Sequence, residues 1–400
     1  MRKPELLAPA GNPERLEMAL AYGADAVYVG GPEFGLRASA GSFDAAAMAQ
    51  AAARCHGLGR KLYVTMNIFA RQEDLGPMAA YAQFLQGAGA DGALVSDPGA
   101  LRRIQRAAPA LPIFLSTQAN TLNADACAFW LEQGVRRIVL ARELSYEQIA
   151  RIRELTPPGL ELEVFVHGAM CMAYSGRCLL SLATTGREAN RGACAQPCRW
   201  VFRGGPPRDE LAHELAVEQD DQGSYLLSAK ELCMYDHLDR LLALGLDSLK
   251  IEGRMKSLHY VATVVNAYRM GIDAAAAGRP LPALGRRELM AIKHRPYDTG
   301  FYFGQPGQVD LRAPETPEAK VAAIVRGCDE GGAWVEQRFP FARGNRLSVL
   351  SPGRTPWCFT AERMEDDQGR PIDRAPHPQM RVRLHPPRPL RPWDILRLNP

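Results

Sequence analysis

Hydrophobic and polar positions follow one repeated pattern along the first 277 residues. A short, continuous apolar run ends in a polar residue or glycine, and an amphipathic stretch with apolar residues at helical spacing follows it. Continuous apolar runs are typical of parallel strands that are buried on both faces, whereas half-exposed strands alternate. The pattern predicts eight such strands, which begin at Glu5, Ala26, Lys61, Gly92, Ile113, Arg137, Glu163 and Ser248.

Helices are predicted between these strands, because apolar residues recur there at intervals of three and four. Glycine stands between a helix and the next strand in phrases such as AYGADAVYVG, where a left-handed C-cap is needed. Eight βα units in succession predict a closed (β/α)8 barrel of the TIM type rather than an open Rossmann sheet. No GxGxxG follows the first strand, which also disfavours the Rossmann alternative. The clearest helical segments are NPERLEMALAYGA, FDAAAMAQAAARC, YEQIARIREL and LCMYDHLDRLLALG.

The connection between the seventh and eighth strands breaks the pattern, with 79 residues from Ala169 to Asp247. It contains five of the nine cysteines, in an insertion that we place at residues 171–235. Because the insertion follows a barrel strand, we expect it at the C-terminal face, where barrel enzymes place their active sites.

The pattern changes after the eighth strand. A closing helix from Ser257 completes a barrel domain of residues 1–277, and the proline- and glycine-containing residues 278–319 are interpreted as a linker. From there, short alternating runs separated by Gly and Pro predict a small antiparallel β-barrel domain over residues 320–400.

Composition and charge narrow the class of protein. An apolar fraction of 46% and a charged fraction of 23% are those of a soluble globular protein. No apolar run approaches the roughly 20 residues that span a bilayer, and the N-terminus lacks the apolar core of a signal peptide. We therefore expect a cytoplasmic protein without membrane contact. The net charge of +4 permits binding of nucleic acid without requiring it.

Nine cysteines in a reducing compartment argue against a disulfide framework and favour metal or redox use of some of them. Thiolates suit zinc or an iron–sulfur cluster, and either needs about four of them to converge. Only Cys194 and Cys198 have the spacing of a zinc knuckle, and a radical-SAM motif would need a third cysteine where Val201 stands. Spacing alone leaves a metal or cluster site and a structural or redox role open. The cysteines of the insertion are Cys171, Cys178, Cys194, Cys198 and Cys233.

Several longer motifs are more specific than the cysteine spacing. They are PELLAPAGN, GADAVYVGG, FGLRA, HGAMCMAYSGRC, SAKELC and DSLKIEGRMKS. Through them the chain resembles the peptidase U32 family along nearly its whole length. That family takes its name from a reported protease activity. Its better understood bacterial members are oxygen-independent hydroxylation proteins that act on a wobble uridine of tRNA, a cytidine of large-subunit rRNA or the ubiquinone ring.

The resemblance implies a [4Fe–4S] cluster on four cysteines, which match Cys171, Cys178, Cys194 and Cys233 here. Cys198 is a reserve, because one branch of the family uses both cysteines of its CxxxC pair with an upstream cysteine that FGLRASAGSF lacks. The C-terminal β domain is similar to that of the tRNA-directed branch. The resemblance thus implies tRNA as the RNA partner, prephenate as the source of the hydroxyl oxygen, and, as in some members, a homologous partner subunit.

Polar residues at the C-terminal ends of strands are the candidates for catalysis in a barrel. His167, four residues before Cys171, is predicted to act as an acid or base or to donate to a cluster sulfur, with an orienting role equally open. Glu252, with Arg254 and Lys256 in IEGRMKS, places a carboxylate and two cations at the mouth, as a catalytic carboxylate with an anion site or as a salt-bridged scaffold. Further candidates are Asn67, Asp97, Gln118, Asn120 and Glu143 at strand ends, and Arg37, which would meet a substrate carboxylate or lie on the surface.

Three hypotheses about function remain. The leading one is an iron–sulfur enzyme that supports oxygen-independent hydroxylation of a pyrimidine base in RNA, with a tRNA wobble uridine as substrate. The second is a peptidase acting on collagen-like or other extended chains. A Cys171–His167 pair would serve it, but HEL at residues 213–215 lacks the second histidine of HExxH, and no GxSxG occurs. The third is a cluster-carrying subunit for hydroxylation of the ubiquinone ring or of rRNA.

Overall fold

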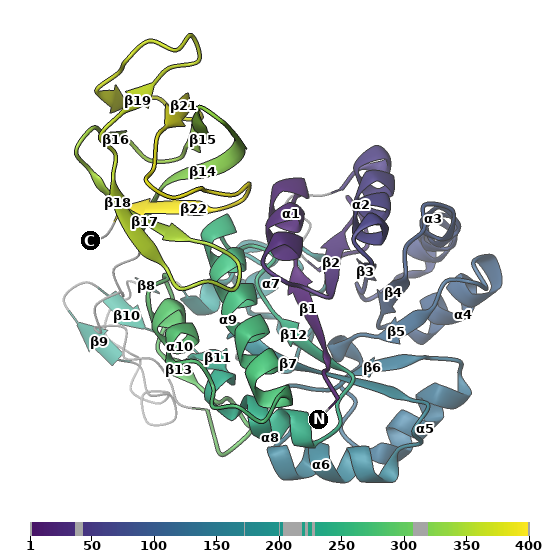
Figure 1. Ribbon diagram of the computed structural model, residues 1–400. Coiled ribbons are helices and arrows are strands. Elements are labelled where there is room, and N and C mark those ends of the chain that lie inside the picture. The colour runs from purple at the N-terminus through teal and green to yellow at the C-terminus, as the bar shows by residue number, and fades with distance from the viewer. Residues whose placement is uncertain are drawn as a thin grey trace.

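The computed structural model describes residues 2–36, 43–171, 173–199, 201–202, 218–220, 223–225, 229–306 and 319–398. Eight parallel strands form a closed barrel, because the last strand pairs with both the seventh and the first. The TIM-like barrel is therefore confirmed (Figure 1). All eight strands lie where the sequence predicts them: β1 Glu5–Pro9, β2 Ala26–Gly30, β3 Lys61–Met66, β4 Gly92–Val95, β5 Ile113–Leu115, β6 Arg137–Val139, β7 Glu161–Ala169 and β12 Ser248–Ile251.

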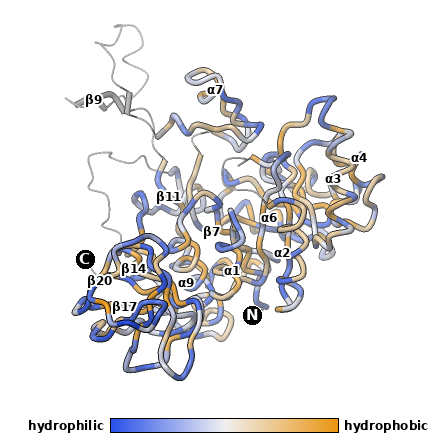
Figure 2. Tube along the Cα trace, turned by 90° about the horizontal axis from the view of Figure 1, so that it is seen from above, coloured by the Kyte–Doolittle hydropathy of each residue, from blue (hydrophilic) through white to orange (hydrophobic). Residues whose placement is uncertain are grey.

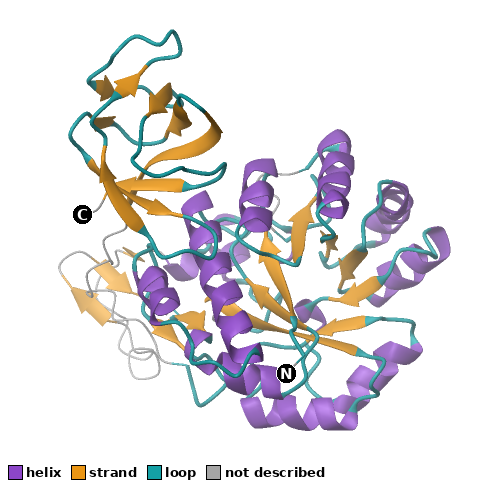
Figure 3. Ribbon diagram, viewed as in Figure 1, coloured by secondary structure: helices purple, strands orange, loops and turns teal. Residues whose placement is uncertain are grey.

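Helices surround the barrel on its outside (Figure 3). Many of them begin with a side-chain cap, in which an Asn, Asp or Ser oxygen accepts the backbone N–H three residues ahead; the capping residues are Asn12, Asp44, Asp97, Asn123, Ser145 and Ser257. Such caps satisfy donors that the start of a helix leaves unpaired. The helices are α1 Pro13–Ala21, α2 Ala45–Gly57, α3 Leu75–Gly87, α4 Pro98–Ala107, α5 Ala124–Glu132, α6 Tyr146–Leu155, α8 Leu238–Ala243, α9 Leu258–Ala276 and α10 Ala283–Met290.

Two predictions about elements need correction. The segment LCMYDHLDRLLALG is predicted as one helix, but α8 begins only at Leu238, and Glu231–Cys233 forms strand β11, which adds antiparallel to the long strand β7. Apolar spacing in so short a segment fits either element, so the edge offered by β7 decides. The predicted linker contains α10 and also strand β13 Tyr297–Asp298, which pairs with β11. Arg37 and the HEL tripeptide at 213–215 lie outside the described residues.

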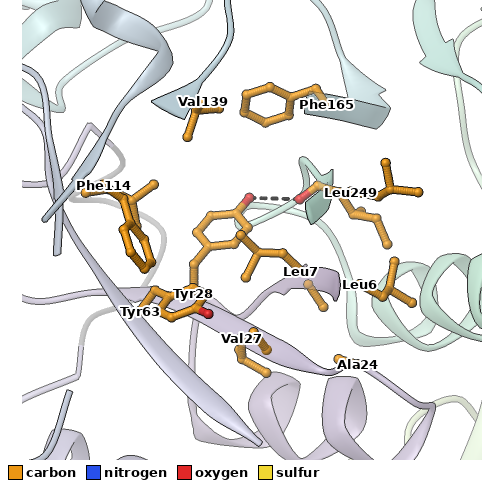
Figure 4. Close-up of a cluster of buried hydrophobic side chains, with 14 of the residues drawn as sticks. Leu6, Leu7, Ala24, Val27, Tyr28, Tyr63, Phe114, Val139, Phe165 and Leu249 are labelled. Carbon is orange, nitrogen blue, oxygen red and sulfur yellow. Dashed lines mark hydrogen bonds between the residues drawn. The ribbon is translucent and has the colours of Figure 1, made fainter. Parts of the chain in front are cut away.

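Side chains fill the interior of the barrel. Figure 4 shows Leu7, Tyr28, Tyr63, Phe114 and Phe165 packed there, and each is at most 7% exposed. The Tyr28 hydroxyl donates to the carbonyl oxygen of Ile251 at 3.0 Å, which ties β2 to the end of β12. A filled interior leaves room for a substrate only above it, at the carboxyl ends of the strands.

The cysteine-rich insertion packs against the loop that follows β3. Arg191 Nη1 is 2.7 Å from Asp74 Oδ2, and this hydrogen bond lowers the pKa of Asp74 to about 2. The backbone N–H of Phe69 donates to the carbonyl oxygen of Asn190 at 3.2 Å. Figure 2 shows helix α7, at Leu180–Thr185, far from the C-terminal strands. Three further short strands of the insertion pair with one another: β8 Val201–Phe202, β9 Glu218–Asp220 and β10 Gly223–Tyr225.

An antiparallel β domain follows the barrel, as predicted. Its main strands are β14 Lys320–Asp329, β15 Gly332–Gln337, β17 Arg346–Leu350, β18 Trp357–Thr360, β19 Met364–Glu365, β21 Arg381–Leu384 and β22 Ile395–Leu398. They pair in the order β18-β17-β22-β14-β15-β21-β19, and β16 Phe341–Ala342 pairs with β20 Arg374–Ala375. In the part of the chain that the structure describes, no helix is both long and apolar enough to cross a membrane.

The C-terminal domain packs on the first and last helices of the barrel ring. The Tyr22 hydroxyl at the end of α1 donates to the carbonyl oxygen of Leu350 at 2.8 Å. On α9, Asn266 Oδ1 accepts the backbone N–H of Gly353, also at 2.8 Å. Ile324, Leu350 and Ile395 belong to the hydrophobic core of the barrel domain, so the two domains share buried surface.

Candidate functional site

A pocket opens at the carboxyl ends of the barrel strands. Its floor includes Tyr28 and Phe165 from the packed interior, and polar side chains stand around it. Four sequence-predicted candidates meet here: Asn67, Gln118, Glu252 and Arg254. This face carries the chemistry in barrel enzymes. The full lining is Tyr28, Leu36, Thr65, Asn67, Leu94, Ser116, Thr117, Gln118, Arg142, Phe165, Lys250, Glu252 and Arg254.

Two amides and one hydroxyl, from Asn67, Ser116 and Gln118, form a hydrogen-bonded group on the wall of the pocket, which we call the Asn67 network. Asn67 Nδ2 donates to Ser116 Oγ and to Gln118 Oε1, both at 3.0 Å. The Ser116 hydroxyl also donates to Gln118 Oε1. The backbone N–H of Leu36 donates to Asn67 Oδ1 at 3.4 Å. The network joins the ends of β3 and β5 and gives this wall a fixed pattern of donors and acceptors.

Glu252 and Arg254 lie at the rim of the pocket, where the sequence predicts them. Glu252 is partly exposed, and its Oε2 is 3.4 Å from the Tyr28 hydroxyl. Arg254 is 3% exposed, and its Nη1 donates to Thr65 Oγ1 at 2.9 Å. Gly168 makes room for this loop, because its φ is +110° and a Cβ there would overlap the carbonyl oxygen of Glu252. The carboxylate can therefore accept a proton or a hydrogen bond from a bound molecule, while Arg254 is held in the wall.

Lys250 and Arg142 add positive charge to the pocket. Lys250 Nζ is 3.0 Å from the carboxylate of Glu163, which lies deeper in the barrel. Although burial alone would raise the pKa of Glu163, Lys250 and Arg137 together hold that pKa below its ordinary value. The Arg142 guanidinium lies 5.0 Å from the centre of the Phe165 ring. Because Lys250 is paired with Glu163, Arg142 is the cation that suits an anionic group, a carboxylate or a phosphate, on a bound molecule.

His167 does not line this pocket. The pairing of β7 with β12 shifts in register between Lys250 and Ile251, which turns the histidine away from the barrel interior. The ring is 1% exposed, and its Nδ1 is 3.3 Å from the Tyr268 hydroxyl. Burial, only partly offset by Glu231, lowers the pKa of His167 to about 3, so the imidazole is neutral near pH 7. This position suits the orienting role that the sequence leaves open better than acid–base chemistry in the pocket.

Two of the predicted cluster ligands flank the end of β7. Cys171 lies two residues after the end of β7 and is exposed, with its Sγ 3.5 Å from Arg142 Nη2. Cys233 lies on β11 opposite His167, and burial raises the pKa of its thiol to about 11. The imidazole of His167 packs against Tyr268 rather than reaching Cys171, so the geometry does not favour the pair that a cysteine peptidase would need.

Cys178 and Cys194 are half-exposed in the segment around α7. The Ser181 hydroxyl accepts the backbone N–H of Ala195 at 3.0 Å, which holds the two cysteine-bearing stretches together. Thiol donors suit an iron–sulfur cluster chemically. Among the described residues, however, no three Cys, His, Asp or Glu side chains stand together as metal ligands. The structure does not test the cluster, and the ligand set stays a prediction.

Sequence reasoning missed the charged residues inside the barrel. Arg137, Glu163 and Lys250 stand in the apolar runs RIVLAR, EVFVHG and SLKIEG and pair with one another in the interior. Their presence in buried strands was the available signal, because a buried charge needs a partner. Among the other strand-end candidates, Asp97 caps α4 and does not line the pocket. Burial raises the pKa of Glu143, which also lies outside the lining.

Fold and site together define a TIM-type barrel protein with a polar pocket at its carboxyl end, a cysteine-rich insertion beside that pocket and a C-terminal β domain. The chain belongs to peptidase family U32: residues 11–311 match the family model, and residues 317–397 match the model of the family's C-terminal domain.

Several of its relatives carry names from RNA modification, while a relative from Porphyromonas gingivalis, 35% identical over 75% of this chain and 74% of that protein, is named "Collagenase". The chain is 38% identical to "tRNA hydroxylation protein P1" of Bacillus subtilis, over 99% of this chain and 95% of that protein. It is 34% identical to "tRNA hydroxylation protein P" of Escherichia coli, over 94% and 92% of the two chains. It is also 37% identical to the "23S rRNA 5-hydroxycytidine C2501 synthase" of E. coli, over 86% of this chain and 52% of the relative.

Proposed function

We propose that this chain is an RNA-modifying enzyme that supports oxygen-independent hydroxylation of a pyrimidine base, with a wobble uridine of tRNA as its substrate. The observation that carries the proposal is the pocket at the carboxyl end of the barrel, whose wall combines amide, hydroxyl, carboxylate and cationic groups over an aromatic floor. The names of the relatives support the same class of reaction, hydroxylation of a base in RNA.

The pocket suits a base that has left its stack. Enzymes that modify a base inside RNA bind it in a recess, and single-stranded loops offer such bases at low cost. Tyr28 and Phe165 would pack against the ring, and the Asn67 network would meet its polar edge. Glu252 is the partly exposed carboxylate of the rim and is the group that we assign to accept a proton or a hydrogen bond from the base.

We propose further that the reaction uses a [4Fe–4S] cluster held by Cys171, Cys178, Cys194 and Cys233, with Cys198 in reserve. When bound, such a cluster supplies one-electron transfer. Metal binding and local folding are coupled in many sites, so the thiols would converge when iron and sulfide are supplied. The proposed source of the hydroxyl oxygen is prephenate, a dicarboxylate, for which the guanidinium of Arg142 is a suitable partner.

The test of the reaction is a nucleoside analysis of tRNA by mass spectrometry. A deletion strain should lack the hydroxyuridine that wild-type cells contain, and the wild-type gene should restore it. Cys178→Ala and Glu252→Gln should not restore it, whereas Cys358→Ala, which changes an exposed cysteine of the C-terminal domain, should. An unchanged nucleoside profile in the deletion strain would remove the proposed function.

The test of the cluster is the iron content of protein purified without air. The wild type and Cys358→Ala should be brown, with about four iron atoms per chain, and alanine at each proposed ligand should lower the iron content. Colourless, iron-free wild type that still modifies tRNA would refute the cluster. If the metal-free protein cleaves peptides and alkylation of its thiols abolishes this cleavage, the chain is a peptidase instead. Stable co-purification of a homologous chain would support a cluster-carrying subunit.

A further inference from the structure

We infer that Gln118 sets the choice of base, by offering a hydrogen-bond donor to the pocket that matches the carbonyl of uracil at position 4 and not the amino group of cytosine. The inference rests on the proposed function, because it takes the pocket of the barrel mouth as the site of the base. Beyond the proposed function, it specifies which pyrimidine base the pocket accepts and which side-chain atom contacts that base.

The polarity of the Asn67 network begins at the backbone. The N–H of Leu36 is only a donor, so the side-chain atom of Asn67 that faces it at 3.4 Å has to be the carbonyl oxygen Oδ1. Asn67 Nδ2 therefore faces the other way, toward Ser116 Oγ and the Gln118 amide. Reversing Asn67 would set two donors against each other at Leu36. Asn67 is 7% exposed, which leaves water little access to relieve that clash.

The hydrogen bond from Asn67 fixes the orientation of the Gln118 amide. The atom of Gln118 that receives the Asn67 Nδ2–H at 3.0 Å, and the hydrogen bond from the Ser116 hydroxyl, has to be the acceptor Oε1. The amide nitrogen Nε2 is then the remaining end, and it makes no hydrogen bond to any residue in the part of the chain that the structure describes. Gln118 lines the pocket, and these two N–H groups are the donors that the inference assigns to a bound base.

The two pyrimidines differ at the position that such a donor reads. Uracil carries an oxygen acceptor at position 4, and cytosine carries an amino donor there. A fixed donor pairs with the first and opposes the second, and an unmatched buried donor is costly. Position 4 also adjoins the carbon named in the product of the rRNA-directed relative, 5-hydroxycytidine. A group that reads position 4 would therefore lie close to the reacting carbon.

Two substitutions reverse this polarity by different routes. Gln118→Glu replaces the presented donor by an acceptor. Asn67→Asp leaves Gln118 in place but turns the atom facing it into an acceptor, so that the Gln118 amide should rotate and present Oε1 to the pocket. Gln118→Leu removes donor and acceptor together. Gln148→Glu is the matched control, because it makes the same chemical change at the exposed capping box of α6, where Glu also serves.

The measurement is the ratio of dissociation constants for oligouridylate and oligocytidylate of equal length, with the ratio of hydroxyuridine to hydroxycytidine in cellular tRNA beside it. Wild type and Gln148→Glu should bind oligouridylate about tenfold more tightly, the discrimination of one well-placed base contact. Gln118→Leu should bind the two equally, and Gln118→Glu and Asn67→Asp should favour oligocytidylate.

The outcomes separate this inference from the proposed function. If tRNA hydroxyuridine depends on the chain while Gln118→Glu and Asn67→Asp keep the uridine preference, the role of Gln118 is wrong and the function stands. If the deletion strain loses no modified nucleoside, the proposed function is wrong. The ratio of the two dissociation constants then still tests whether Gln118 selects the base. Equal binding of the two oligonucleotides by wild type overturns the inference even if no variant folds.

Discussion

The two ends of the barrel interior both contain charged and polar side chains, but they use them differently. At the amino end, Arg137 contacts Glu5 at 2.6 Å, Glu161 at 2.7 Å and Glu163 at 3.1 Å. Lys250, which lines the pocket, contacts Glu163 from the other side at 3.0 Å. At the carboxyl end, Gln118 keeps a donor for the pocket and Glu252 is partly exposed. Polar groups that satisfy one another serve stability, whereas groups with bonding capacity left over serve a bound molecule.

The largest effect that this comparison predicts is on stability at the amino end. Glu163→Gln leaves Lys250 buried beside a neutral amide and removes one of the three carboxylates around Arg137, and we expect a loss of about 3–5 kcal/mol in the free energy of unfolding. Urea denaturation measures it. Glu154→Gln, which breaks an exposed pair with Arg151, is the control and should cost less than about 1 kcal/mol. Equal losses in the two variants would show that the interior pairs do not stabilise the barrel.

The next effect is on activity at the carboxyl end. Glu252→Gln should lower the hydroxylation rate about 100-fold, because it removes the carboxylate that we assign to accept a proton. The free energy of unfolding should change by less than about 0.5 kcal/mol, since the side chain is partly exposed and keeps its size. Single-turnover tRNA modification and urea denaturation on the same preparation give both values. A stable variant with full activity would remove Glu252 from the reaction.

Substitution of Gly168 should affect both stability and activity, because this residue packs against the backbone of Glu252. Gly168→Ala places a methyl group against the carbonyl oxygen of Glu252 at a φ of +110°, and we expect a loss of about 2 kcal/mol in the free energy of unfolding. Activity should fall with it, since the loop that carries Glu252 has to move. Gly76→Ala, in α3 with no atom within 4 Å of the new Cβ, should be neutral or stabilising by about 0.5 kcal/mol. Matching losses at both glycines would argue against a close approach at Gly168.

The smallest predicted effect is the pH dependence of the stability loss caused by Glu163→Gln. The pKa of Glu163 in the folded protein lies below its ordinary value of 4.5. A carboxyl group of this kind contributes stability that is fully present above its unfolded pKa and is lost as the pH falls through the folded pKa. The difference in unfolding free energy between wild type and Glu163→Gln should therefore be constant near neutral pH and shrink under acidic conditions. A difference that grows on acidification would show that the pKa of Glu163 is raised instead.

The fold could be predicted because parallel strands buried on both faces leave continuous apolar runs, and all eight appear in the sequence. β11 could not, because the residues from Leu232 to Met234 fit a helix or a strand, and only the exposed edge of β7 selects the strand. The prediction that Asn67, Gln118, Glu252 and Arg254 lie together at the ends of strands is correct, because parallel strands bring their carboxyl ends to one face of the barrel.

The position of His167 shows the limit of that reasoning. It also ends a strand, but one shift in register between β7 and β12 turns it to the outside, and no local pattern records such a shift. The orientation of the Gln118 amide is similarly hidden, because it depends on a donor from Leu36, far away in the sequence. Whether the four predicted cysteine ligands converge depends on a segment whose packing is not set by periodicity, and that remains a prediction.

The docking of the last domain has a consequence for the order of events during synthesis. A ring of units made one after another has a joint where the first meets the last, here β1 against β12. The C-terminal domain contacts the barrel on both sides of this pairing, through hydrogen bonds to Tyr22 on α1 and to Asn266 on α9. Until the C-terminal domain has emerged from the ribosome, these contacts across β1 and β12 cannot form, and the apolar surface of the barrel that receives Ile324, Leu350 and Ile395 stays exposed to water.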